Sequence, residues 1–150
     1  MPRIADKNPR YRTKKQMCSD LSFVLNADLM FGTKMSVFNE ILWVWTEFDG
    51  KFQGCKYWSK NAKKAFKDDK KAKLIHEHLV PRNILREKIF ELQNPSPEIL
   101  YDILNEFCIG VVVTKEEDNT LNSLGLRSKM PSDWDKKNPW ARHEKAEISC

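Results

Sequence analysis

Paired cysteines are missing from this sequence. Its four cysteines, Cys18, Cys55, Cys108 and Cys150, are spread along the whole chain. A zinc ribbon or zinc finger takes its ligands from closely spaced pairs such as CxxC, so the sequence argues against that class of site. We expect reduced thiols in a cytoplasmic protein, with Cys108 buried because it opens an apolar run.

Long hydrophobic stretches are also missing. The longest apolar run covers residues 108–113 and is interrupted by a glycine, whereas a transmembrane helix needs about 20 apolar residues. Residues 1–15 are polar and basic and have no apolar segment like that of a secretory signal. The sequence contains no internal repeats. We therefore expect one soluble domain of 150 residues, long enough to bury a core and without a membrane partner.

Positive charge is present in moderate excess and is unevenly distributed. The net charge is +5 and the pI is about 9.0, which permits an anionic partner without proving one. One cluster of cations lies in the N-terminal segment and a second lies between residues 60 and 73. Each cluster alone is typical of a solvated helix face, but two in one half favour a nucleic acid. The candidate nucleic-acid-binding residues are Arg10, Arg12, Lys60, Lys63, Lys64 and Lys67.

Hydrophobic periodicity and capping residues predict a mostly helical chain. Helices are expected at 13–30, 35–48, 59–71, from 82 to about 93, from 97 onward, 115–125 and 139–147. Residues 31–33 are expected to break the first two helices apart. Ser59, Ser96 and Thr114 are the expected N-caps, the last within a T-x-x-E capping box. Strands are expected at 73–76, leading into the following histidines, and at 108–113.

These elements predict an α+β fold, mostly helical, with a small two- or three-stranded sheet. We expect residues 1–150 to form one domain, in which 1–12 is a flexible basic arm and 13–72 is a helical half. Residues 73–125 form a ββα-metal-like unit with a helical insertion, and 126–150 form a tail with a short helix. The sequence leaves the oligomeric state open, and a homo-oligomer is one alternative.

The most informative segment is His76-Glu77-His78, followed by an apolar pair, Pro81 and Arg82. It holds two of the three histidines, and histidine is both a common metal ligand and the side chain that titrates near neutral pH. Strand alternation places His76 and His78 on one face and Glu77 on the other. The alternative is a surface loop whose histidines cap the next helix.

Two segments resemble the motifs of HNH endonucleases. Residues 77–81 (Glu-His-Leu-Val-Pro) are similar to that family's first motif, an acidic residue or histidine, then histidine, an apolar pair and proline. Residues 112–118 (Val-Val-Thr-Lys-Glu-Glu-Asp) are similar to the entry of the family's helix. The resemblance implies a ββα-metal site in which a single divalent ion and a histidine base hydrolyse a phosphodiester.

The resemblance also implies roles for individual residues. His78 would be the general base, Glu77 a metal ligand and Asp118 the ligand presented by the helix, with His76 as a further candidate ligand. Arg82 would contact a phosphate oxygen. For Asp118 the alternative is a carboxylate that only stabilises the start of a helix.

The sequence thus favours an HNH-like, metal-dependent endonuclease that acts on DNA and uses Mg²⁺ or another divalent ion. The alternative is a non-catalytic module that binds nucleic acid or protein on a degenerate ββα scaffold. The first hypothesis makes a geometric prediction. Residues 73–78 should pair with 109–113, the helix after Thr114 should pack on them through Leu121 and Leu124, and an Asp118 oxygen should lie near a His78 ring nitrogen.

Overall fold

The computed structural model describes residues 9–150. Most of the expected basic arm, residues 1–8, lies outside this range. The described part contains seven helices and three short strands, which confirms the predicted α+β class. The elements are α1 (Lys14–Asn26), α2 (Phe31–Glu47), β1 (Tyr57–Trp58), α3 (Lys60–Asp68), β2 (Leu74–His78), α4 (Arg82–Phe90), α5 (Pro97–Phe107), β3 (Gly110–Thr114), α6 (Lys115–Ser123) and α7 (Ala141–Lys145).

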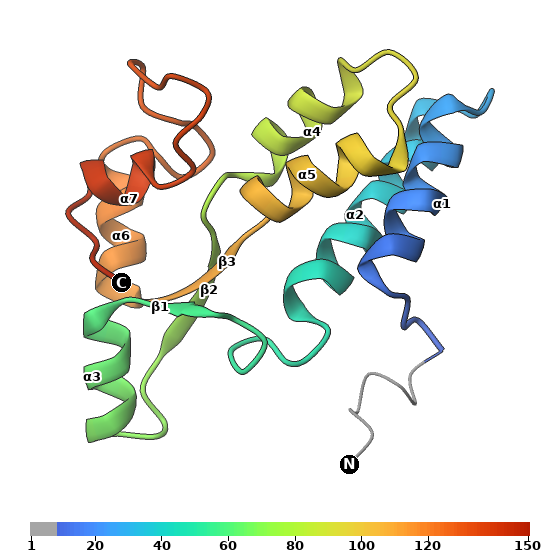
Figure 1. The fold of residues 1–150 in the computed structure, drawn as a ribbon. Helices are drawn as coiled ribbons and strands as arrows, with labels where there is room; N and C mark the ends of the chain where they lie inside the picture. Colours follow the sequence, from blue (N-terminus) through green and yellow to red (C-terminus); the bar gives the residue numbers. More distant parts are fainter. Residues whose placement is uncertain (1–8) are drawn as a thin grey trace.

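Helices α1, α2, α4 and α5 pack together on one side of the molecule (Figure 1). Their core is a continuous apolar cluster that includes Leu21, Phe38, Leu42 and Leu104, each at most 1% exposed. The cluster also contains Cys108, as the sequence predicted, and burial raises the pKa of this thiol to about 12. The packing of these four helices brings the last turn of α2 beside the sheet.

The prediction that residues 31–33 separate the first two helices is wrong. The chain is extended at Met30, which precedes the first turn of α2, and the helix begins at Phe31. Gly32 therefore lies within the first helical turn, where the helix tolerates its lack of a side chain. The glycine suggested a stop, but the apolar face of α2, which packs against α1 and α4, extends the helix toward it.

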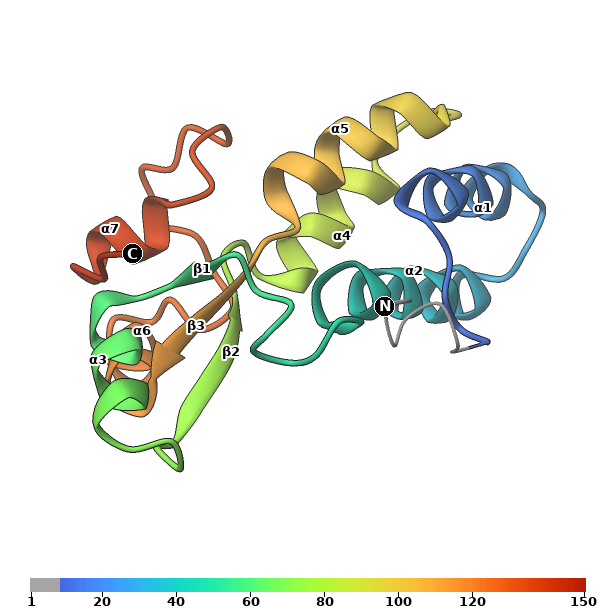
Figure 2. The same cartoon turned by 60° about the horizontal axis from the view of Figure 1, so that its bottom comes forward.

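The sheet has the order β1-β3-β2 (Figure 2). Strand β2 runs antiparallel to β3, with His76 opposite Val112 and His78 opposite Gly110. Strand β1 pairs with β3 in parallel. The predicted pairing of residues 73–78 with 109–113 is thus confirmed. Since β3 is central and fully buried, β2 is an edge strand whose outer side is open to a neighbouring cavity.

Helix α6 follows β3 directly and contacts both β2 and β3. Its start is the predicted capping box, in which Thr114 Oγ1 accepts from the Glu117 amide while the Glu117 carboxylate accepts from the Thr114 amide. Leu121 is buried against the sheet, as predicted. The prediction for Leu124 is wrong, because the helix ends at Ser123 and the Leu124 side chain is 49% exposed.

Helix α3 covers one face of the sheet, where Ala62 packs with Val112, and α6 and α7 cover the other face, where Leu121 packs with Val111 and Val113. The predicted helical half, residues 13–72, therefore divides between two packing environments, because β1 and α3 pack with the sheet and not with α1 and α2. Ser59 caps α3 and Ser96 caps α5, as predicted. Among residues 9–150, no helix has the length and apolar character needed to span a membrane.

Candidate metal centre

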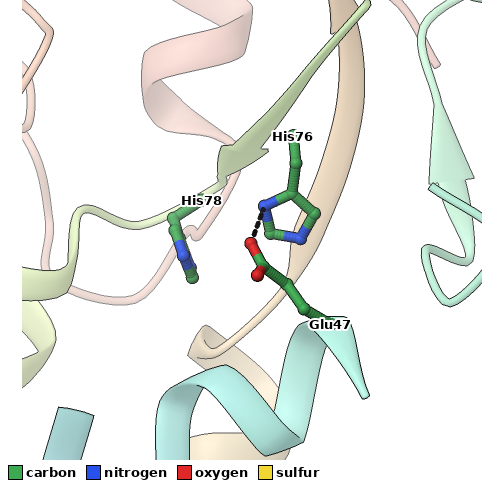
Figure 3. Close-up of side chains that lie close together, drawn as sticks. All are labelled: Glu47, His76 and His78. Atoms are coloured by element: carbon green, nitrogen blue, oxygen red, sulfur yellow. Dashed lines mark ion pairs between the residues drawn. The ribbon is translucent and has the colours of Figure 1, made fainter. Parts of the chain in front are cut away.

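The two histidines of β2 lie on the same face of the strand. His76 and His78 are two residues apart in an extended segment, so their side chains point in the same direction. Their ring centroids are 5.2 Å apart. Both rings face the end of α2, as Figure 3 shows.

Glu47, the last residue of α2, completes a group of three potential ligands. Its Oε1 lies 3.2 Å from Nδ1 of His76. One ligand atom from each of Glu47, His76 and His78 lies within 4.8 Å of the others (Figure 3). Two imidazoles and one carboxylate form the donor set of many catalytic zinc and iron sites, which leave further coordination positions open.

Burial keeps both imidazoles neutral. It lowers the pKa of His76 below 6.5, against the opposing effect of the Glu47 carboxylate. Burial also lowers the pKa of His78, to about 3, and the positive charges of Arg82 and Arg142 add to this effect. Metal binding requires the free lone pair of a neutral imidazole, so the surroundings hold both side chains in the form that binds a cation.

The His76 ring is fixed on both of its edges. Nδ1 lies 3.2 Å from the Glu47 carboxylate, which only accepts hydrogen bonds, so a proton on this nitrogen would face an acceptor. The opposite nitrogen, Nε2, is buried without a hydrogen-bond partner among the described residues and packs against Gly110, where a Cβ would lie only 2.5 Å from it. A cation bound through Nδ1 would take the place of the proton.

A cavity of about 620 Å³ lies along β2. Both histidines line it, together with three arginines from α4 and the loop after α6 (Arg82, Arg86 and Arg127) and the amides of Asn39 and Asn83. Arg82 and Arg127 are exposed and Arg86 is half-buried. A concave site that combines potential metal ligands with several guanidinium groups suits an anionic ligand.

The structure does not bring Glu77 to the two histidines. Glu77 lies on the opposite face of β2, where Arg142 binds its Oε1 and Nε2 of His143 lies 2.8 Å from its Oε2. Arg142 and His143 are both fully buried. The strand stays straight, so the alternation expected from the sequence directs Glu77 into this ion pair.

Asp118 lines the cavity but lies outside the three-residue group. Its Oδ2 accepts a hydrogen bond from Lys115 Nζ at 3.0 Å, within the first turn of α6. This carboxylate therefore faces the same cavity as His78 and is paired with a cation of its own helix. That is the environment expected of a side chain that stabilises a helix start.

The predicted nucleic-acid-binding residues fall into two groups. Lys60, Lys63, Lys64 and Lys67 are all exposed on α3. Arg10 and Arg12 both pair with Glu40 of α2, and the Arg10 guanidinium lowers the pKa of the Glu40 carboxyl. These two arginines therefore hold residues 10–12 against α2.

Sequence reasoning missed Glu47, Arg142 and His143. Glu47 ends a helix whose pattern indicated core packing, and no local signal marks it as a ligand. His143 is the only histidine outside β2, and this rarity was the available signal. No protein-family model, curated protein or solved structure matches this chain.

Proposed function

We propose that this protein is a metal-dependent phosphodiester hydrolase, an endonuclease acting on DNA, and that its cation is held by Glu47, His76 and His78. The single observation that carries the proposal is the convergence of these three ligands beside a cavity lined by guanidinium groups that form no ion pair with any residue from 9 to 150. A divalent cation bound there would act as a Lewis acid toward a phosphate and would lower the pKa of a bound water.

Arg82 would supply substrate binding. Arg82 begins α4 directly after the turn at Pro81, and its charge acts on the His78 imidazole. A guanidinium presents two parallel N–H donors that match the oxygens of a phosphate. Arg82 would thus orient the scissile phosphate beside the cation and neutralise part of its charge.

The proposed unit consists of β2, β3 and α6, the elements that the HNH resemblance implied, but α6 packs on the face of the sheet opposite the two histidines. The ligand set that we propose differs from the one implied by that resemblance. His78 acts as a ligand in place of a general base, and Glu47 takes the role expected for Glu77. The cation would then lie on the face of β2 that is turned toward α2.

The exposed lysines of α3 support a nucleic acid substrate. Four of them occupy positions 60, 63, 64 and 67, so they cover adjacent parts of one short helix. Such a surface contacts phosphates without reading sequence. We propose that α3 contributes to binding the DNA backbone.

Cleavage of supercoiled plasmid DNA tests the proposed function. The purified protein should cleave it in the presence of a divalent ion and not in the presence of a chelator. Glu47→Gln and His78→Ala should each reduce the rate by more than about 100-fold, beyond the 10- to 100-fold cost of outer-shell changes.

Glu40→Gln is the matched control, because Glu40 lies on the same helix as Glu47 and, within residues 9–150, pairs with Arg10 and Arg12 and not with the candidate ligands. It should retain wild-type cleavage. Equal rates for wild type and His78→Ala, both folded by circular dichroism, would contradict the proposed function.

A further inference from the structure

Two of the cavity arginines lie one turn apart on the same helix. Arg82 and Arg86 occupy positions i and i+4 of α4, so their side chains lie next to each other on the face that lines the cavity. A third, Arg127, reaches the cavity from the loop after α6. Within residues 9–150, none of these three guanidinium groups takes part in an ion pair or a hydrogen bond.

Hydrogen bonds hold the backbone of the loop that carries Arg127, whereas the Arg127 side chain is not held. Asn83 Nδ2 donates to the Ser128 carbonyl at 2.9 Å. From the other side, the buried Arg142 donates to the carbonyls of Leu126 at 2.5 Å and Arg127 at 3.4 Å. The backbone of an exposed residue is thus fixed by two side chains, and its guanidinium is left available for a ligand.

The carboxylates that line the cavity are already engaged. Glu77 is bound by Arg142 and His143, and Asp118 by Lys115. The three arginines therefore face the cavity without a neutralising partner among the described residues, which makes it a place where an anion is favoured. Three guanidinium groups carry more positive charge than is needed to neutralise a single scissile phosphate.

We propose that Arg86 and Arg127 form a phosphate-binding subsite separate from the metal group, and that it holds a phosphate adjacent to the scissile one on the same strand. The proposal rests on the proposed function and specifies its substrate as an internal phosphodiester of a polynucleotide. Arg82 serves the scissile phosphate, and Arg86, one turn further along α4, serves its neighbour together with Arg127.

The test measures binding of a single-stranded DNA oligonucleotide to metal-free protein in chelator over a series of salt concentrations. Each phosphate contact of a single strand contributes a slope of about −0.7 in the plot of log K against log salt. Arg86→Gln and Arg127→Gln should each reduce the magnitude of the slope by about that amount and weaken binding. Arg86→Lys and Arg127→Lys, which keep the charge, should retain most of the slope.

Lys88→Gln is the matched control, because Lys88 lies on α4 two residues from Arg86 and outside the cavity. Its slope should equal that of the wild type. Every variant is checked for its fold by circular dichroism. Lysine variants that lose as much slope as the glutamine variants would overturn the subsite, because the effect would then follow from altered structure.

The same titration with inorganic phosphate distinguishes a free anion from a strand. We expect free phosphate to compete with the oligonucleotide only weakly. Competition by inorganic phosphate at the affinity of the oligonucleotide would overturn the strand assignment. Because no metal is present, the binding measurement does not depend on hydrolysis. If the wild type cleaves DNA but the Arg86→Gln and Arg127→Gln variants keep the wild-type salt slope, only the subsite is overturned. If these variants lose slope but the wild type does not cleave DNA, only the proposed function is overturned.

Discussion

Gly110 is the residue whose small size the candidate metal centre requires most directly. A Cβ at this position would lie 2.5 Å from His76 Nε2 and 3.1 Å from Cys55 Sγ. The His76 ring would then have to move, and its other nitrogen would leave the position facing Glu47. The absence of a side chain at Gly110 therefore sets the orientation of a proposed ligand.

Gly110→Ala should weaken binding of Zn²⁺ or Co²⁺ by about 10- to 100-fold, the usual cost of disturbing the support of a ligand. Isothermal titration calorimetry measures the affinity. Gly32→Ala is the control, because a Cβ at Gly32 meets no atom within 4 Å, and its affinity should match that of the wild type. Equal affinities in both variants would show that the His76 orientation does not matter.

The depressed pKa values of the two histidines predict how stability depends on pH. In the unfolded chain both imidazoles titrate near 6.5, whereas in the folded protein the pKa of His78 is about 3 and that of His76 is also lowered. The unfolded state therefore binds more protons below pH 6.5, and the free energy of unfolding of the metal-free protein falls as the pH drops through this range.

Urea unfolding from about pH 7.5 to about pH 4.5 measures this dependence. The wild type should lose stability progressively below pH 6.5, and His78→Gln should lose less over the same range. Stability that rises on acidification in the wild type would contradict the burial of neutral imidazoles.

At the level of elements, α7 is tied to the end of β2 by one buried side chain. Arg142 donates to the carbonyls of His78 and Leu79 and to the Glu77 carboxylate, and also to carbonyls of the loop after α6. It thereby fixes the backbone of a proposed ligand and the loop that carries Arg127. The C-terminal helix is part of the support of the site although it contributes no ligand.

Arg142→Met should destabilise the protein by about 3–5 kcal/mol, because it leaves the largely buried Glu77 carboxylate, whose side chain is 11% exposed, without its arginine. The double variant Arg142→Met/Glu77→Met should recover part of this loss, since no buried charge then lacks a partner. Denaturant unfolding of the two single variants and the double variant measures the coupling. Strictly additive losses would mean that the two side chains do not depend on each other.

Local signals in the sequence predicted the elements well. The capping box at Thr114, the serine caps at Ser59 and Ser96, and the alternation of β2 depend on residues within one turn or one strand, so they can be read from the sequence. The start of α2 could not be read from the sequence. The packing of its apolar face extends the helix to Phe31, although Gly32 in the first turn disfavours helix formation. Local chemistry therefore predicted where most elements begin, and tertiary packing determined the rest.

At the level of the whole molecule, the candidate centre depends on the meeting of two sides of the fold. Its histidines come from the sheet, and its carboxylate comes from the end of a helix in the apolar cluster of the other side (Figure 3). Strand alternation predicted from the sequence that the two histidines share a face. The position of Glu47 could not be predicted, because only the packing of α2 beside β2 brings that carboxylate to the rings.

The same packing explains why the ligand set implied by family resemblance differs from the one that we propose. The resemblance concerned two segments close to β2 and α6, and it selected Glu77 and Asp118 from them. In the folded chain these two carboxylates pair with Arg142 and Lys115. The carboxylate that faces the histidines belongs to a segment outside both motifs.

The most direct test of the central claim is an anomalous difference map from crystals of the protein grown or soaked with Zn²⁺. We expect one strong peak bounded by Glu47, His76 and His78, with metal–ligand distances of about 2.0–2.2 Å, and the loss of this peak in Glu47→Gln. A peak between Glu77 and Asp118, or no ordered ion near the two histidines, would contradict the central claim.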